Sequence, residues 1–215
     1  EEWVIRNQKY IFIVIIFVAF LVLGYLGFNK IIQEPKESKA TNDMFQSQQY
    51  FDKAVNGASK DSLFTLALNG ANGKYGFLDI ADVYSGTKAG NLANYYAGIA
   101  YLNMKDYSNA VTYLNNFSSE DDVLGPISKG AIGDAFVQLE QLEDAYGYYV
   151  EAAKLKSNIY TTPMYLYKAG VIGLKIDKYN KALAFFNQIK LEFPDSAEAK
   201  DIDVFIGKAE AALNQ

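Results

Sequence analysis

Three lines of sequence decide the fold of this chain: ANYYAGIAYLNMKDYSNAVTYLNNF at residues 93–117, GPISKGAIGDAFVQLEQLEDAYGYYVEAAK at 125–154 and TPMYLYKAGVIGLKIDKYNKALAFFNQIKLEFP at 162–194. Aligned on their glycines, the lines place Gly98, Gly133 and Gly170 at spacings of 35 and 37 residues. Ala110, Ala145 and Ala182 keep the same two spacings. A period near 34 residues is typical of stacked helix pairs. The segment therefore predicts three repeats, at about 93–124, 125–161 and 162–194.

Close packing within a pair of helices explains why small residues recur at these positions. A glycine in the first helix and an alanine in the second let two antiparallel helices approach closely, and Gly98 with Ala110 would form one such contact. Aromatic residues one turn after the glycines, such as Tyr101 and Phe136, would fill the space beside the crossing. We therefore expect an all-α fold in which the three glycines and three alanines are the repeat-packing residues.

This pattern resembles the tetratricopeptide repeat family through those glycines and alanines, together with Tyr107, Tyr179, Phe186 and Pro194. At the place of the family's leading tryptophan, the three repeats have Asn94, Lys129 and Leu166. The resemblance implies an α-solenoid of antiparallel helix pairs with a concave, protein-binding face. An irregular all-helical bundle is the alternative that the sequence leaves open.

A candidate protein-binding groove follows from the tetratricopeptide register. Six residues are expected on the exposed face of the first helices: Tyr95, Asn103, Asp134, Gln138, Met164 and Tyr167. They mix aromatic, soft and hydrogen-bonding side chains, as adaptable peptide grooves do. For each residue the alternative is a side chain that is solvated or covered by a neighbouring helix.

Helices of another kind flank the repeats within the predicted domain, residues 41–215. On the N-terminal side we expect a helix at 42–58, with Met44, Phe51 and Val55 turned inward, and short helices near 62–68 and 77–84, which glycines separate. Helices that depart from the repeat pattern are expected at the ends of a solenoid.

On the C-terminal side, residues 196–213 predict a capping helix. Asp195 and Glu198 would form its N-terminal capping pair. Its apolar residues step by four, three and four: Ile202, Ile206, Ala209 and Leu213. This spacing predicts one amphipathic face that covers the last repeat.

An uncharged run, YIFIVIIFVAFLVLGYLGF, occupies residues 10–28. As a helix it would cover about 28 Å of hydrocarbon, which is enough to cross a bilayer. It is longer than the apolar core of a cleaved signal peptide and is followed by no small-residue cleavage site, so we expect a retained transmembrane helix. Residues 1–9 form its N-terminal flank and 29–40 a polar, proline-containing connector to the domain. Gly24 and Gly27 are candidates for a close contact with another membrane helix.

The charges around this run do not decide its orientation. Arg6 and Lys9 precede it, whereas Lys30, Lys36 and Lys39 follow it, so cations lie on both sides.

Composition excludes several classes of function. The chain has no cysteine and no histidine, which removes thiol nucleophiles, disulfides, imidazole bases and the usual zinc ligands. From residue 41 on, 15 basic residues face 21 acidic ones, a net charge of −6, so nucleic acid is not an expected partner. We expect a protein that is not an enzyme and that uses no cofactor or metal.

Four fragments resemble motifs of chemistry without completing one. GANGKY at 70–75 has the wrong spacing for a phosphate loop. Ser85 and Lys88 have the Ser-x-x-Lys spacing of some acyl-transfer enzymes, and a peptidase or transferase there is the enzymatic alternative. The acidic residues 120–122 lack the alternating ligands of a calcium loop. The N-glycosylation triplet at 116–118 is relevant only in a glycosylating compartment.

One span, a short connector and an acidic helical-repeat domain together resemble the bacterial YfgM family over the whole chain. That resemblance implies an ancillary subunit of the Sec translocon in the inner (cytoplasmic) membrane, with its N-terminus in the cytoplasm and its repeats in the periplasm. It also implies a PpiD-type membrane-anchored periplasmic chaperone as partner, with the repeats near emerging secreted chains. The alternative is a scaffold subunit of another envelope assembly, secretion or motility complex.

Overall fold

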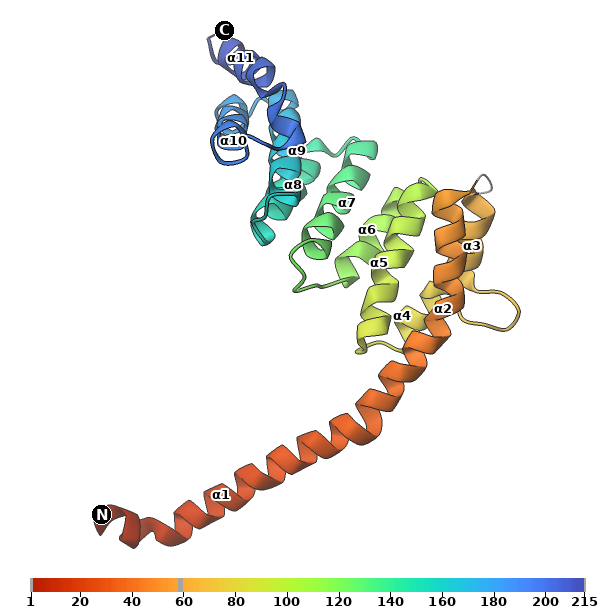
Figure 1. Ribbon diagram of the computed structural model, residues 1–215, viewed down its shortest axis with the longest axis vertical. Coiled ribbons are helices and arrows are strands. Elements are labelled where there is room, and N and C mark those ends of the chain that lie inside the picture. The colour runs from red at the N-terminus through yellow and green to blue at the C-terminus, as the bar shows by residue number, and fades with distance from the viewer. Residues whose placement is uncertain (1, 58–59, 215) are drawn as a thin grey trace.

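The computed structural model describes residues 2–57 and 60–214, and most of these residues are helical. Within them no strand forms, and an isolated bridge joins Ala71 to Lys74. The expected all-α class is therefore confirmed. The N- and C-termini lie at opposite ends of an elongated molecule (Figure 1).

The N-terminal part is a long helix that leads into the domain (Figure 1). α1 (Glu2–Phe28) passes through a π-helical turn, η1 (Asn29–Gln33), into α2 (Glu34–Asn56). The N–H of Glu34 donates to the carbonyl of Asn29, five residues earlier. Pro35 follows in the first turn of α2, where a missing N–H is tolerated. The segment 29–40, expected as a connector ahead of the first domain helix, is thus helical itself.

α2 packs against α3 (Lys60–Asn69) and α4 (Phe77–Val83), the two short helices expected from the sequence. Its buried face comprises Ala40, Met44, Ser47, Phe51 and Ala54, which step by four and three as one helical stripe. The expectation for Val55 was wrong: this side chain is 48% exposed, because Ala54 holds the inward position. α2 also begins at Glu34 instead of residue 42, and residue 58, the expected end, lies outside the described residues.

Aromatic rings form the core where α2, α3 and α4 meet the next helix. Phe51 packs edge-on against Phe64 with ring centroids 5.5 Å apart. Phe77 stacks on Tyr96 at 5.0 Å. Phe64 and Phe77 are fully buried, so these rings join the N-terminal helices to the rest of the domain.

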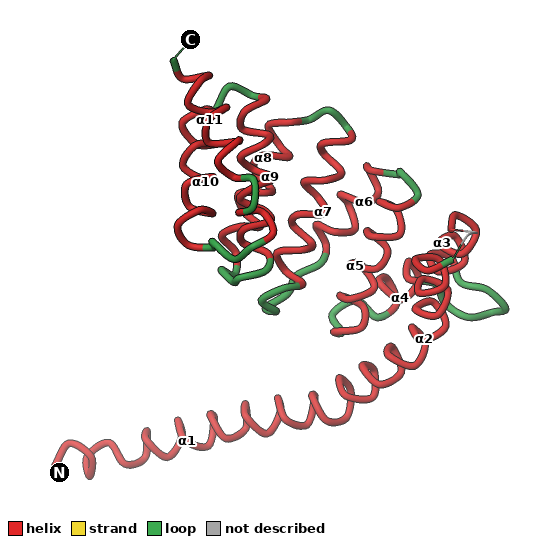
Figure 2. The backbone as a smooth tube through the Cα atoms, turned by 45° about the horizontal axis from the view of Figure 1, so that its top comes forward, coloured by secondary structure: helices red, strands yellow, loops and turns green. Residues whose placement is uncertain are grey.

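Six further helices follow in three pairs. They are α5 (Lys88–Asn103) with α6 (Tyr107–Asn116), α7 (Leu124–Gln138) with α8 (Leu142–Leu155), and α9 (Thr161–Lys175) with α10 (Tyr179–Glu192). Each packs on its neighbours in sequence, and the first helices also touch one another, α5 with α7 and α7 with α9. Figure 2 shows this succession of helices leading away from α2.

The turn inside each pair has one conformation. Lys105, Glu140 and Asp177 adopt positive φ angles of 65°, 60° and 59°, and they are spaced as the repeat glycines are. The next residue's N–H reaches back five positions, as from Asp106 to the Tyr101 carbonyl at 2.9 Å. This is a Schellman ending, a helix C-terminus at which glycine is the usual left-handed residue.

The C-terminal end differs from the expected single helix at 196–213. A short 3-10 turn, η2 (Ala197–Ala199), precedes α11 (Ile202–Leu213). Ser196, and not the expected Asp195 and Glu198 pair, caps this turn by accepting from the Ala199 N–H. Of the expected inward face, Ile202 and Ala209 are buried, Ile206 is half-buried and Leu213 is 39% exposed.

Candidate functional site

The repeat glycines lie where two helices of a pair cross. A Cβ on Gly98 would stand 2.5 Å from Cγ of Leu114, and one on Gly133 would stand 2.7 Å from Cδ1 of Tyr149. Gly170 faces the ring of Phe186 in the same way. Each facing residue comes four positions after the repeat alanine, so the nearest atoms to Gly98 belong to Leu114 and not to Ala110.

The repeat alanines are fully buried. Ala110, Ala145 and Ala182 each have 0% exposure. Ala182 faces a second glycine of the first helix, because a Cβ on Gly173 would lie 3.5 Å from its own Cβ. The glycine and alanine positions thus lie at successive turns of the same crossing.

Three of the six expected groove residues pack against other helices or loops. Tyr95 contacts Phe117 with ring centroids 5.2 Å apart. Tyr167 meets Phe205 of α11 edge-on at 5.0 Å, so the C-terminal helix covers it. Met164 is half-buried beside the core that α8 to α11 share.

Asp134 lies at the centre of a polar contact among three helices. Its Oδ1 accepts a 2.5 Å hydrogen bond from the hydroxyl of Tyr149 in α8 and lies 2.7 Å from Nζ of Lys168 in α9. Lys168 also lies over the rings of Tyr149 and Tyr165, at 5.4 and 5.8 Å from their centroids. We call these four residues the Asp134 cluster.

Burial dominates the electrostatics of this cluster. It raises the pKa of Tyr149 above its usual value, and the hydrogen bond to Asp134 and the charge of that carboxylate add to the rise. Burial, followed by the charge of Asp134, also raises the pKa of Tyr165. Both phenols are therefore neutral at physiological pH. Because the Asp134 carboxylate already holds a phenol and an ammonium group, the cluster braces α7, α8 and α9 against one another.

The last two groove candidates are exposed. The Asn103 amide donates to the carbonyl of Ile99 in its own helix at 2.8 Å. Gln138 accepts a long hydrogen bond, 3.3 Å, from the hydroxyl of Tyr107. The six residues are thus divided between core packing, an interhelical brace and solvent.

A set of contacts that the sequence did not reveal joins the end of η1 and the start of α2 to the segment between α4 and α5. The Gln33 amide donates to the carbonyl of Gly86 at 2.8 Å, and Lys36 Nζ donates to that of Ser85 at 3.0 Å. Glu37 accepts from the N–H groups of Lys88 and Ala89, at 2.6 and 2.9 Å. We call Gln33, Lys36 and Glu37 with this segment the anchor collar. No sequence signal pairs residues about 50 positions apart.

The collar includes the main chain of Ser85 and Lys88, the two residues with the Ser-x-x-Lys spacing. Main-chain atoms of both residues bind side chains of α2, Ser85 through its carbonyl and Lys88 through its N–H. The side chain of Thr87 caps α5 by accepting from the N–H of Gly90 at 2.9 Å. The segment thus begins α5 and binds the first turn of α2.

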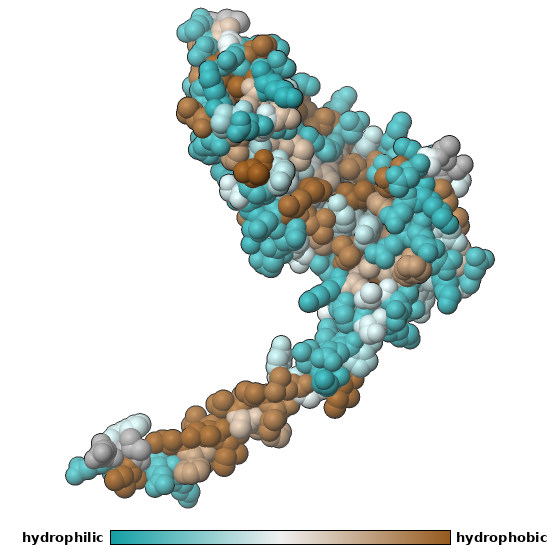
Figure 3. Space-filling view, in the orientation of Figure 1, coloured by the Kyte–Doolittle hydropathy of each residue, from teal (hydrophilic) through white to brown (hydrophobic). Residues whose placement is uncertain are grey.

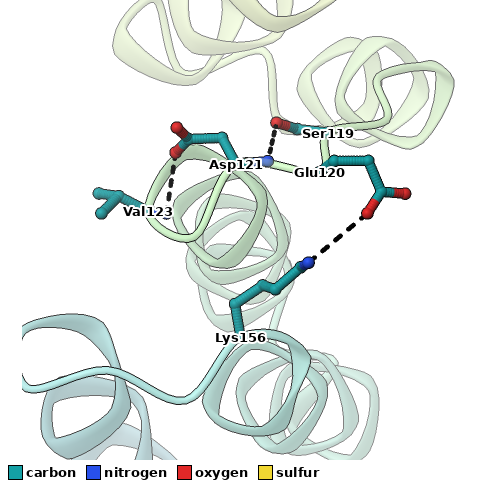
Figure 4. Close-up of polar contacts among 5 residues, drawn as sticks. All are labelled: Ser119, Glu120, Asp121, Val123 and Lys156. Carbon is teal, nitrogen blue, oxygen red and sulfur yellow. Dashed lines mark hydrogen bonds and ion pairs between the residues drawn. The ribbon is translucent and has the colours of Figure 1, made fainter.

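Of the acidic residues 120–122, Glu120 and Asp121 point in different directions (Figure 4). Glu120 points to Lys156, with an N–O distance of 3.5 Å. Asp121 Oδ1 accepts from the N–H groups of Val123 and Leu124, and these bonds lower the pKa of its carboxyl group. Among the described residues, no three acidic side chains gather as a metal site would require.

In the view of Figure 3, the most continuous apolar surface lies along α1. It is the one helix in the described ranges that is long and apolar enough to cross a membrane, and none of its apolar window is buried. A Cβ on Gly24 or Gly27 would meet no atom within 4 Å, so the two candidate contact residues face open space.

Comparisons with known proteins return no relative: no protein family, no curated protein and no solved structure matches this chain.

Proposed function

We propose that the chain is a membrane-anchored scaffold that binds other proteins through a tetratricopeptide-like solenoid. The observation that carries the proposal is the neighbour-by-neighbour packing of α5 to α11. Helices stacked in this way leave a long continuous surface, which is how helical-repeat domains bind peptides and partner domains. The shared spacing of the glycines, alanines and left-handed turn residues supports the repeat interpretation.

In this proposal residues 10–28 span the bilayer and hold the solenoid at the membrane surface. The support is the exposure of the apolar side chains of α1, for example Phe20 at 74% and Leu23 at 68%, which water would solvate poorly. Tethering raises the effective concentration of the domain for partners in the same membrane. The anchor collar would keep the first repeat at a fixed place relative to the span.

For the partner we propose the Sec translocon of the bacterial inner membrane, with a PpiD-type chaperone beside it and the solenoid in the periplasm. The support is the sequence resemblance in architecture, span and repeat segments. In this arrangement Gly24 and Gly27 would allow a close contact with a partner's membrane helix.

Crosslinking mass spectrometry on intact membranes tests the proposal. We expect the full chain to crosslink to translocon subunits or the chaperone, and a variant lacking residues 1–32 to lose these crosslinks. Circular dichroism must show that the shortened domain remains helical. Undiminished crosslinks of the folded, shortened domain would contradict the role of the anchor. Crosslinks to a different envelope complex would assign the scaffold to that complex instead of the translocon. A full chain that crosslinks to no protein would contradict the proposed scaffold function.

A further inference from the structure

The most exposed large apolar side chains of the domain lie at one end of α8, α9 and α10. Among the described residues from Ala40 onward, they are Leu191 at 79%, Tyr160 at 74% and Ile159 at 68%. Ile159 and Tyr160 occupy the loop between α8 and α9, and Leu191 lies in the last turn of α10. Single exposed apolar residues are common, but two adjacent ones, such as Ile159 and Tyr160, indicate an interaction site.

The side chain of Asn158 holds this loop in place. Its Oδ1 accepts from the N–H groups of Tyr160 and Thr161, at 2.9 and 2.8 Å. Its Nδ2 donates to the carbonyl of Asp122 at 2.8 Å and to the hydroxyl of Thr161 at 2.7 Å. Because the loop is tied to α9 and to the preceding inter-repeat loop, Ile159 and Tyr160 are presented to solvent on a fixed backbone. A fixed presentation lowers the entropy that binding costs.

A pocket of about 460 Å³ separates this loop from the end of α10. Its apolar lining comprises Ile159 and Tyr160 from the loop, with Phe193 and Pro194 from the segment that follows α10. Three carboxylates also line it, those of Glu192, Asp195 and Glu198, and no lysine or arginine is among its described lining residues. Glu192 accepts a hydrogen bond from Gln188 in its own helix, which leaves acceptor capacity toward the pocket.

We propose that this Ile159–Tyr160 pocket binds an extended segment of a partner protein in which a bulky apolar side chain adjoins lysine or arginine. The apolar walls fit the former and the acidic lining the latter, and the net charge of −6 from residue 41 on favours a cationic partner. The inference rests on the proposed function as a protein-binding scaffold, and it specifies the surface and the chemistry of its ligand.

Fluorescence anisotropy with three labelled peptides tests the chemistry, using the full chain in detergent micelles. The first probe has Lys-Leu-Lys-Phe between Gly-Ser flanks, the second replaces Leu and Phe by Ser, and the third replaces both Lys by Glu. We expect binding of the first alone, weakened by salt. An Ile159→Ser/Tyr160→Ser variant should lose at least about tenfold in affinity. Glu192→Gln/Asp195→Asn should weaken binding and reduce its salt dependence.

Phe45→Ser is the matched control, because it removes a side chain that is 61% exposed on α2, remote in sequence from the pocket. All variants alter exposed residues, so their melting temperatures should equal that of the wild type. Equal affinity of the first peptide for the wild type and the Ile159→Ser/Tyr160→Ser variant would overturn the proposal. So would failure of that peptide to bind at about 1 mM.

A photo-crosslinking amino acid separates failure of the pocket from failure of the scaffold. Placed at Tyr160 in membranes, it should capture a partner protein through a segment of the stated composition. Capture from Asn103 or Gln138 but not from Tyr160 would reject the pocket and leave the scaffold standing. No capture from any of the three positions would reject both.

Discussion

The hydroxyl of Tyr149 donates a 2.5 Å hydrogen bond to the carboxylate of Asp134, and so joins α8 to α7. Hydrogen bonds to a charged group contribute about 1.5–3 kcal/mol. We expect Tyr149→Phe to lower the free energy of unfolding by about that amount, measured by urea denaturation of the full chain in detergent. Tyr148→Phe, whose hydroxyl contacts Asn115 at 3.2 Å, is the control and should cost less. Equal losses of unfolding free energy in the two variants would show that the hydrogen bond to Asp134 stabilises the fold no more than the one to Asn115 does.

The ring of Phe186 leaves no space for a methyl group on Gly170. Gly170→Ala should therefore destabilise the protein by about 1–3 kcal/mol, the usual cost of overpacking a core. Gly207→Ala in α11 is the matched control, because a Cβ there meets nothing within 4 Å. The control should be neutral or stabilising by up to about 1 kcal/mol, since alanine favours a helix more than glycine does. Thermal unfolding followed by circular dichroism measures both, and a stable Gly170→Ala protein would contradict the close crossing.

Glu140 holds a left-handed conformation at φ 60°, where a side chain is disfavoured. Glu140→Gly should stabilise the protein by up to about 1 kcal/mol, because glycine adopts this conformation without strain. Glu140→Ala keeps the Cβ and should leave the urea midpoint nearly unchanged. If Glu140→Gly lowered the urea midpoint, the Glu140 side chain would stabilise the fold by more than its left-handed backbone conformation costs.

Tyr84 is expected to make the folded state less stable as the pH rises above 10. Its hydrogen bond to Asp43, its burial and the charge of that carboxylate raise its pKa to about 12, against about 10 in an unfolded chain. The folded state therefore holds this proton more tightly. The resulting stability is complete below pH 10 and is lost as the pH rises toward 12, at up to about 1.4 kcal/mol per pH unit. Between pH 10 and 12, Tyr84→Phe should show a shallower fall in urea midpoint than the wild type. Tyr160→Phe, at an exposed position, should retain the wild-type slope; equal slopes for all three proteins would contradict the assignment.

The periodicity of the sequence was sufficient to predict the positions of most of the helices. Small residues at a fixed spacing located the helices, and the uncharged run at 10–28 located the apolar helix. Periodicity could not place contacts between distant segments, such as Glu37 with Ala89, because no local pattern pairs them. It also placed Tyr167 on an open face, since the sequence of α9 does not reveal that Phe205 of α11 packs on this ring. The connector was misjudged because Pro35 is normally a helix breaker, and the π-helical turn that precedes it was not anticipated.

The helix continues without a break from α1 through η1 into α2. The number of residues between α1 and α2 therefore sets the rotation of α1 about its own axis relative to the domain. Each residue turns an α-helix by about 100°, so inserting or deleting one between Phe28 and Glu34 would rotate α1 about its axis relative to the domain by more than a quarter turn. The side chains of the domain would keep their own neighbours. In the proposed membrane arrangement, the length of the five-residue turn η1 therefore determines the direction in which the Ile159–Tyr160 pocket faces relative to a neighbouring membrane protein.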